Sequence, residues 1–382
     1  IGGHTHTLDV IWQGERHAID TGFIVFNDWT YPHFIRLLEH LKVASRPTEM
    51  SFSVHDPATG LEYNGHDLNT LFAQRRNLVS PGFWGMLRDI LRFNRQALAD
   101  LDNQRIDANA TLGAYLQMQR YGQRFIDHYI VPMGSAIWSM SRADMLGFPL
   151  AFFVRFCRNH GLLSVNQRPQ WRVIEGGSRS YVGPLCRPFA GRIRLDCKVY
   201  RVSRDEGGVT LMSAAGTERY DNVVFACHSD QALALLEAPS VQEREVLGAI
   251  GYASNDVVLH TDTRLLPHRK RAWASWNYRL GGPQQAPAAL TYNMNILQGI
   301  QAPATFCVSL NQTALVDPAQ IIARFQYDHP QYSLAACAAQ ARQAQLQGQR
   351  HSYFCGAYWG NGFHEDGVVS ALKVAAHFGE HL

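Results

Sequence analysis

Apolar and polar residues recur along the chain with two different periods, and these periods predict its elements. Alternation at every second residue predicts strands at Thr7–Gln13 and His17–Phe26. Apolar residues spaced three and four apart predict a helix within Asp28–Val43. A hairpin is expected at Ser51–Tyr63, because turn-forming residues occupy Pro57–Gly60 between two apolar runs. The first part of the chain is therefore predicted to be mainly strand.

The segment 66–165 has helical periodicity instead. Helices are predicted at Trp84–Leu101, Leu112–Arg120 and Gln123–Ser139, where apolar residues lie on one face among polar ones. No nucleotide-binding motif occurs in this segment. We interpret it as an insertion of helices between two parts of another domain.

Short strands return after residue 170. A strand at Trp171–Ile174 runs through glycines into a predicted helix at Tyr181–Phe189. Four further strands are expected, at Ile193–Leu195, Lys198–Arg204, Val209–Met212 and Tyr220–Cys227. The last is nearly continuous in apolar residues, which is typical of a strand buried on both faces of a parallel sheet.

The last part of the chain alternates strands with loops and ends on a glycine-rich junction. The strands are predicted at Asp256–His260, Trp273–Tyr278, Ala289–Asn293 and Thr305–Leu310, followed by a helix at Ala335–Gln349. A strand at Ser352–Cys355 then leads through Gly356–Gly362 into a helix at Asp366–Phe378. This ending returns to the pattern of residues 171–235.

Composition narrows the protein class. Hydrophobic residues make up 46% and charged residues 18% of the 382 residues, which is the balance of a globular chain with two domains. The net charge of +3 is too small to indicate a nucleic-acid partner.

Cysteine content and hydropathy indicate in which cellular compartment the protein is expected. The seven cysteines are odd in number and form no Cys-x-x-Cys pair, so we expect a reducing cytoplasm. No apolar stretch reaches the roughly 18 residues that cross a bilayer, so no transmembrane segment is predicted, and peripheral membrane contact stays open. The chain starts at Ile1 and runs directly into two glycines, and we expect it to begin inside a motif, without its first segment.

The glycine-rich junction from Tyr353 to Val368 carries the clearest chemistry. Glycines let a backbone approach a bound group closely, and the free N–H groups of the following helix point at an acceptor or a negative charge. Such a junction suits a cofactor, although an ordinary loop before a terminal helix has the same pattern. The acidic pair Glu365 and Asp366 is interpreted as a helix cap.

Four weaker features add to this junction. Gly2 and Gly3 lie in a loop, and the strand Cys197–Val202 has backbone groups that could pair with an adenine edge. His4 and His6 have no evident third ligand, so no metal site is predicted. The aromatic residues of the predicted strands fit either a core or the wall of a cavity, and they are Trp273, Trp276, Tyr278 and Tyr292.

In chain order these segments resemble one superfamily, the flavin-containing amine oxidases and phytoene-desaturase-like proteins. The opening Ile1–His4 resembles the end of the family's Arg-x-Gly-Gly motif, and Asp20–Phe23 its Asp-x-Gly segment. Glu175–Ser178 resembles its glycine-rich step from strand to helix. A bacterial subgroup of NAD/FAD-binding, amine-oxidase-like proteins is most similar, at Asp20–Tyr31, Tyr292–Gln298 and Gly362–Val369.

The resemblance implies FAD as the cofactor and an α/β fold of two domains. A Rossmann-like FAD-binding domain is expected at 1–65, 166–250 and 351–382, and a sheet-plus-helices substrate-binding domain at 66–165 and 251–350. The expected cofactor-binding residues are Gly2, Gly3, His4, Thr5, Thr21, Gly22, Phe23, Val199, Gly356, Ala357, Glu365, Asp366, Gly367 and Val368. The family's Gly-x-Gly-x-x-Gly loop does not occur in the sequence, and Ala357 stands where many amine oxidases have an acidic residue.

The activity implied is oxidation of a substrate C–H bond by hydride transfer to flavin N5. The substrate is expected to be a small molecule, with Trp276, Tyr292 and Asn293 as candidate cavity residues. One alternative is a flavin-dependent desaturase or isomerase of a lipid or polyene. Another, from a different class, is a flavin-binding protein without catalysis.

Overall fold

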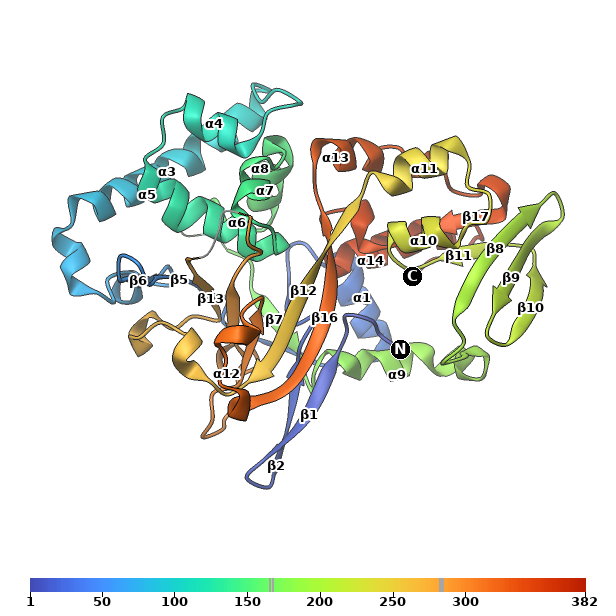
Figure 1. Ribbon diagram of the computed structural model, residues 1–382, viewed down its shortest axis with the longest axis horizontal. Helices are drawn as coiled ribbons and strands as arrows, with labels where there is room; N and C mark the ends of the chain where they lie inside the picture. The colour runs from blue at the N-terminus through green and yellow to red at the C-terminus, as the bar shows by residue number, and fades with distance from the viewer. Residues whose placement is uncertain (165, 167, 282–284) are drawn as a thin grey trace.

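Two lobes lie on either side of a pair of long strands, β12 (Gly251–His260) and β16 (Ile321–Gln331), which run side by side through the middle of the molecule (Figure 1). The computed structural model describes residues 1–164, 166, 168–281 and 285–382. Residue 165, where we place the end of the helical segment, lies outside the described residues.

Strands β12 and β16 belong to a sheet of seven strands in the order β16-β12-β15-β14-β13-β5-β6. Its other strands are β5 (Phe52–Asp56), β6 (Leu61–Asn64), β13 (Trp276–Arg279), β14 (Leu290–Asn293) and β15 (Cys307–Leu310). All neighbours pair antiparallel except β5 and β13, which are parallel. The hairpin predicted at 51–63 therefore forms, but within the sheet of segment 251–350, whereas we predicted it inside the segment 1–65 of the other domain. The domain boundaries stay a prediction.

The sequence pattern missed β16 altogether. Polar and aromatic residues alternate only over Arg324–Asp328, which is less than half of the strand, and no residue of the strand is fully buried. Pairing with β12 over its full length holds the strand in place. Long-range backbone pairing, not local pattern, therefore determines this element.

The first lobe is helical (Figure 1). Its helices are α2 (Leu68–Leu71), α3 (Pro81–Asp102), α4 (Leu112–Met118), α5 (Gln123–Phe125), α6 (Val131–Trp138), α7 (Arg142–Leu146) and α8 (Leu150–Asn159). Phenylalanines such as Phe83, Phe93 and Phe153 fill the core between them and are fully buried. The predicted helices at 84–101 and 112–120 are confirmed.

The helix predicted across Gln123–Ser139 is interrupted by a π-helical turn at Ile126–Ile130. Pro132 has no N–H and cannot donate to the carbonyl of His128. That carbonyl accepts a hydrogen bond from the Tyr63 hydroxyl at 2.6 Å instead. The missing N–H of Pro132 and the bond from Tyr63 together explain the widened turn. Prolines and side chains that interrupt the helical hydrogen bonds are usual causes of such turns.

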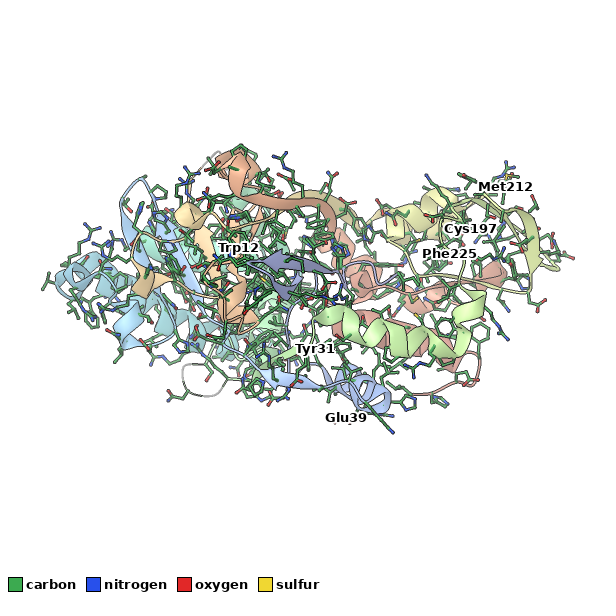
Figure 2. All side chains as sticks on the ribbon, turned by 90° about the horizontal axis from the view of Figure 1, so that it is seen from below. Trp12, Tyr31, Glu39, Cys197, Met212 and Phe225 are labelled. Carbon is green, nitrogen blue, oxygen red and sulfur yellow. The ribbon has the colours of Figure 1, made fainter. Side chains whose placement is uncertain are left out.

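The second lobe is a layered arrangement of small sheets and helices. A meander of β8 (Val199–Asp205), β9 (Gly208–Ser213) and β10 (Gly216–Tyr220) packs beside the parallel pair β11 (Val223–Phe225) and β17 (Ser352–Phe354). The helices are α10 (Ser229–Leu235), α11 (Val241–Gly248), α13 (Leu334–Gln340) and α14 (His364–Ala376). Cys197, Met212 and Phe225 lie in this lobe, away from Trp12 and Tyr31 (Figure 2).

The prediction of a strand buried on both faces at Tyr220–Cys227 is wrong in part. The strand is limited to Val223–Phe225, and Val224 is 45% exposed. Phe225 and Phe354 stack and are buried against α10, α11 and α13, so helices cover one face of the pair and leave the other open. The predicted strand at Ile193–Leu195 is also wrong, because Ile193 and Arg194 have no regular structure and Leu195 begins a turn.

The remaining elements join the two lobes. The hairpin of β1 (Thr7–Trp12) and β2 (Glu15–Asp20) is confirmed, although its second strand ends before Thr21. A small sheet orders β3 (Phe26–Asn27), β7 (Trp171–Ile174) and β4 (Ser45–Pro47). Helix α1 (Pro32–Leu41), a 3-10 turn at Ser178–Tyr181, α9 (Val182–Cys186) and α12 (Met294–Leu297) complete the frame. Across the described residues, no helix combines the length and the apolar character that a membrane span requires.

A buried ion pair ties the second lobe together. Arg204 of β8 and Glu243 of α11 have almost no solvent-exposed side-chain surface, and a guanidinium nitrogen lies 3.0 Å from a Glu243 oxygen. Burial alone would raise the pKa of Glu243, but hydrogen bonds from Arg204 and Ser240 outweigh it and lower that pKa. The carboxylate is therefore charged and holds its partner.

We predict that Glu243→Gln lowers the free energy of unfolding by about 3 kcal/mol, because it leaves the Arg204 charge buried without a counter-charge. Urea denaturation measures this change. The matched control is Glu245→Gln in the same helix, whose exposed pair with Arg342 should contribute about 0.5 kcal/mol. Equal effects of the two substitutions would contradict the account.

Candidate functional site

The loop that opens the chain folds tightly against the loop after β2. Thr5 N donates to Gly2 O at 2.9 Å, and Phe23 N donates to His4 O at 2.6 Å. A Cβ at Gly22 would lie 2.2 Å from His4 O, closer than any side chain allows, so this crossing of two backbones requires glycine. The structure thus brings together seven of the predicted cofactor residues, Gly2, Gly3, His4, Thr5, Thr21, Gly22 and Phe23.

Asp20, directly before this crossing, is fully buried and joins three segments. Its carboxylate accepts hydrogen bonds from Thr7 Oγ1 at 2.6 Å, Ser178 N at 2.8 Å and Gln298 Nε2 at 3.0 Å. Burial raises the pKa of Asp20 to about 6, although the hydrogen bonds from Thr7 and Ser178 oppose the rise. The two glycine-rich loops at residues 2–3 and 176–177 are fixed relative to each other through this side chain.

A chain of hydrogen bonds leads from the opening loop to the start of α14. The Thr5 and Tyr181 hydroxyls are 2.9 Å apart, and the Tyr181 hydroxyl lies 2.8 Å from His364 Nε2. The His364 ring stacks on Phe23 with centroids 4.0 Å apart. Burial, with a smaller contribution from His4, lowers the pKa of His364 to about 4, so the ring is neutral at pH 7.

A second group of rings surrounds His4 on the side facing β16. The His4 ring centroid lies 4.9 Å from that of Tyr327, 5.7 Å from His329 and 6.3 Å from His228. His4 Nε2 and Ser229 Oγ are buried and have no hydrogen-bond partner among the described residues. Unpaired buried polar atoms are costly, so a bound group that pairs with them would be stabilised here.

The C-terminal motif has the geometry of a close turn. Gly356 N donates to Ser370 Oγ at 2.8 Å, and a Cβ at Gly367 would lie 4.0 Å from Ala357 N. The predicted residues Gly356, Ala357 and Gly367 are therefore neighbours. Asp366 accepts a hydrogen bond from Phe363 N at 2.9 Å and caps α14, as predicted, while burial raises its pKa to about 6.

Glu365 was predicted to cap its own helix α14, but its carboxylate binds backbone N–H groups of α1 instead. Its carboxylate accepts hydrogen bonds from His33 N at 3.0 Å and Phe34 N at 2.8 Å, so it holds the first turn of α1. Val368 packs in the apolar cluster around Phe34. These two residues fasten α14 to α1, and their side chains are occupied by that task.

Val199, Trp276, Tyr292 and Asn293 lie apart from the two loops. Val199 begins β8 and packs on the core of the second lobe. Trp276 and Tyr292 contact each other edge to face at 5.1 Å within the apolar clusters of the seven-stranded sheet. Asn293 caps α12 by accepting from Ile296 N at 3.2 Å. The core interpretation fits the last three residues better than the cavity interpretation does.

An aromatic wall lies between the helical lobe and the C-terminal motif. We define it as Trp138, Phe148, Phe152, Phe156, Tyr332 and Phe363, whose rings contact one another at centroid distances of 4.5–6.4 Å. Trp138 Nε1 donates to Asn361 O at 3.1 Å and fixes the wall to the glycine-rich loop. No carboxylate, amine or imidazole belongs to the wall, and its polar groups are the Trp138 N–H and the Tyr332 hydroxyl. Trp138, Phe148, Phe156 and Tyr332 are buried in the core of the helical lobe, whereas Phe152 and Phe363 are partly exposed.

A pocket of about 420 Å³ opens beside Phe363. It lies between the start of α1, the end of α8 and the start of α14, and its lining includes Trp29, Tyr31, His160 and Asn361. Glu365 and Asp366 also reach its lining, but their oxygens already accept backbone hydrogen bonds. The pocket thus combines aromatic rings with polar groups such as Thr30 and Asn159, and both carboxylates of its described lining already accept hydrogen bonds.

Sequence reasoning missed the residues that connect these parts. Tyr181, His228 and His364 come from three separate turns or helix starts, and Tyr327 and His329 come from β16, so no single sequence pattern joins the five residues. His364 stands next to the acidic pair that was noticed, yet only the fold places its ring on Phe23. A pattern within one segment has no means of showing these contacts.

Comparison with known proteins identifies relatives of this arrangement. The family model described as flavin containing amine oxidoreductase matches residues 1–293. None of the curated proteins that were compared matches the sequence.

Solved structures share the fold. A CLA-producing fatty acid isomerase from P. acnes is 12% identical with a TM-score of 0.69, over 98% of this chain and 89% of that one. Putrescine oxidase bound to putrescine is 12% identical with a TM-score of 0.67, over 100% and 92%. Cyclohexylamine oxidase from Brevibacterium oxydans is 14% identical with a TM-score of 0.62, over 98% and 91%. The predicted two-domain α/β fold is confirmed by these likenesses.

We predict that His364 makes the protein acid-sensitive. The folded pKa of about 4 lies below the ordinary 6.5, so the neutral ring contributes fully above pH 6.5 and its contribution is lost as the pH falls toward 4. Between about pH 7 and pH 5, His364→Gln should lose about 2 kcal/mol less of its free energy of unfolding than the parent protein does.

Urea denaturation at the two pH values measures this difference. The control is His66→Gln, an exposed histidine in the helical lobe, which should follow the parent. Equal acid losses in His364→Gln and the parent would refute the role assigned to this ring.

Proposed function

The chain belongs to the flavin-containing amine oxidoreductase family, and from that premise we propose that this FAD-dependent oxidoreductase oxidises a C–H bond of an apolar, lipid-like small molecule. The observation that carries the proposal is the aromatic wall beside the C-terminal motif, together with a pocket whose carboxylates are already engaged. Such a surface favours a substrate without charge at the reacting end.

The residues around the opening loop fit FAD. Gly2 and Gly3 have φ angles of 99° and 55°, which favour glycine. Because glycine has no Cβ, a bound group can approach their backbone closely. His4 Nε2 and Ser229 Oγ are buried polar atoms in need of partners. We propose that FAD is held by Gly2, Gly3, His4, Thr5, Thr21, Gly22, Phe23, Gly356, Ala357 and Gly367. When bound, FAD supplies the two-electron acceptor of the reaction.

The remaining predicted residues take supporting roles in this proposal. The side chains that hold α14 in place are those of Glu365, Asp366 and Val368. We assign them this role because they are already engaged in contacts within the protein. An adenine contact at Val199 stays a prediction.

The protein's own contribution is positioning and exclusion of water. Phe156 and Phe363 stack at 5.1 Å and Phe152 and Tyr332 at 5.1 Å, so the wall is closely packed and apolar except for the Tyr332 hydroxyl and the Trp138 N–H. An acyl or polyene chain lying against it would be desolvated and oriented. The neutral chain from Thr5 through Tyr181 to His364 keeps the start of α14 fixed without placing a charge there.

A primary amine is the second candidate substrate. Putrescine oxidase and cyclohexylamine oxidase share the fold, and the pocket contains Trp29 and Tyr31 close to Glu365. An ammonium group would compete for Glu365 with two backbone amides and the His33 ring, which lies 2.7 Å away. This competition makes the amine the weaker candidate. A protein that binds flavin without catalysis is the third.

We predict that anaerobic addition of an unsaturated fatty acid bleaches the visible absorbance of the FAD-loaded protein, and that putrescine and cyclohexylamine leave it unchanged. The reason is the apolar wall, which desolvates an acyl chain at little cost but an ammonium group at a cost of several kcal/mol. Stopped-flow absorbance measures the bleaching.

A matched pair of variants links the result to the site. Phe363→Ala should lower the bleaching rate constant per unit fatty acid by about tenfold, which equals about 1.4 kcal/mol of lost contact. Phe378→Ala, an exposed phenylalanine at the end of the chain, should have no effect. If only amines bleach the flavin, the lipid-like substrate is wrong and an amine is the substrate. If no compound of either class bleaches it, the result favours a flavin-binding protein without catalysis.

A further inference from the structure

Large apolar side chains are exposed together at the outer end of the helical lobe. Val79 is 83% exposed and Leu68 75%, and Trp84, Leu91 and Leu78 are each about half exposed. They come from consecutive elements, namely α2, the 3-10 turn Arg75–Val79 and α3. A monomeric protein rarely gathers so much apolar surface in one place unless something covers it.

The local structure fixes these side chains outward. Trp84 Nε1 donates to Leu78 O at 2.9 Å, and the Trp84 ring rests on Phe72 at 5.6 Å. The side chain of Ser80 caps α3 directly after Val79. Leu68 is the first residue of α2, which Asp67 and Thr70 cap reciprocally. The exposed positions therefore belong to ordered turns that hold them in solvent.

Helix α3 has a buried stripe and an exposed stripe. Phe83, Met86 and Phe93 face the core of the lobe. The exposed residues Trp84, Arg88, Leu91 and Arg95 are spaced by four, three and four, which places them on one outer face. This face alternates apolar and basic side chains along its length.

The exposed charges between residues 68 and 99 are all basic. Between residues 68 and 99 the charged residues are Arg75, Arg76, Arg88, Arg92, Arg95 and Asp89. Asp89 is buried, accepts a hydrogen bond from Gly122 N at 2.9 Å and pairs with Arg92. Between residues 68 and 99 the outer surface is thus left with arginine and no exposed acid, while exposed Asp67 caps the start of α2 and exposed Asp102 ends α3. A complementary partner must be both anionic and apolar.

We propose that this region docks on an anionic lipid bilayer. The α2–α3 surface consists of Leu68, Leu78, Val79, Trp84 and Leu91 with Arg75, Arg76, Arg88 and Arg95. Its apolar members enter the headgroup boundary, where tryptophan is favoured, and its arginines pair with lipid phosphates. A bilayer surface offers both features over the whole surface, whereas a protein partner would need a continuous acidic and apolar strip. The docking does not depend on which substrate the enzyme oxidises.

The test is co-sedimentation of the FAD-loaded protein with vesicles of phosphatidylglycerol and phosphatidylcholine, and separately with phosphatidylcholine alone. Binding is expected only with the anionic vesicles and should weaken by about tenfold in about 0.5 M salt, because salt screens the arginines. Val79→Asp combined with Trp84→Ala should lower the partition coefficient by about tenfold or more. Arg88→Gln combined with Arg95→Gln should lower it by about tenfold.

The control combines Leu195→Ala with Arg192→Gln, an exposed apolar and basic pair on the second lobe, and it should bind like the parent. Thermal unfolding followed by circular dichroism checks that each variant folds. The proposal is overturned if the parent does not bind anionic vesicles, or if the control loses as much binding as the α2–α3 variants. It is also overturned if those variants abolish a dimer seen by light scattering and leave vesicle binding intact, since the surface would then be an interface between two copies.

Discussion

The buried carboxylate of Asp20 is the constraint on which the site depends. It accepts hydrogen bonds from Thr7, from the start of the turn at Ser178 and from the side chain of Gln298, so it joins the first hairpin, the glycine-rich turn and the end of α12. Strand β2 ends at Asp20, and Gly22 crosses over His4 O two residues later. Tyr181 lies at the end of the turn that Asp20 anchors and reaches both Thr5 and His364. One buried polar hub thus positions the loops that we propose to bind flavin.

Polar and apolar residues lie on different sides of that hub. On one side lie glycine backbones and neutral histidines, with the pKa of His329 and of His364 each lowered to about 4 by burial. On the other side lies the aromatic wall, fixed to the same glycine-rich loop by Trp138. Neutral rings suit a cofactor whose own charge changes during turnover. The apolar wall suits a substrate that has no charge at the reacting end. The two halves meet at the start of α14.

Local patterns predicted what is determined locally. The hairpins, the long helix α3 and the junction Gly356–Gly367 follow from periodicity and glycine placement. Strand β16 did not, because its polar–aromatic alternation is confined to Arg324–Asp328 whereas pairing with β12 holds its full length. The cofactor loops were predicted through family resemblance, whereas the Tyr181–His364 contact joins residues 183 positions apart and has no local pattern. Asn293 shows the converse, since a residue of suitable chemistry proved to be a helix cap.

The most direct test of the account is titration of the protein and of Gly22→Ala with FAD, followed by flavin absorbance and by quenching of flavin fluorescence. A methyl group at this position meets the His4 carbonyl, so the crossing of the two loops must open. The account predicts saturable FAD binding by the parent and a loss of about a hundredfold or more in affinity for the variant, about 2.7 kcal/mol. Gly85→Ala, on α3 with free space around it, should bind FAD like the parent. Equal affinity of Gly22→Ala and the parent would contradict the account, because FAD would then not depend on this pair of loops.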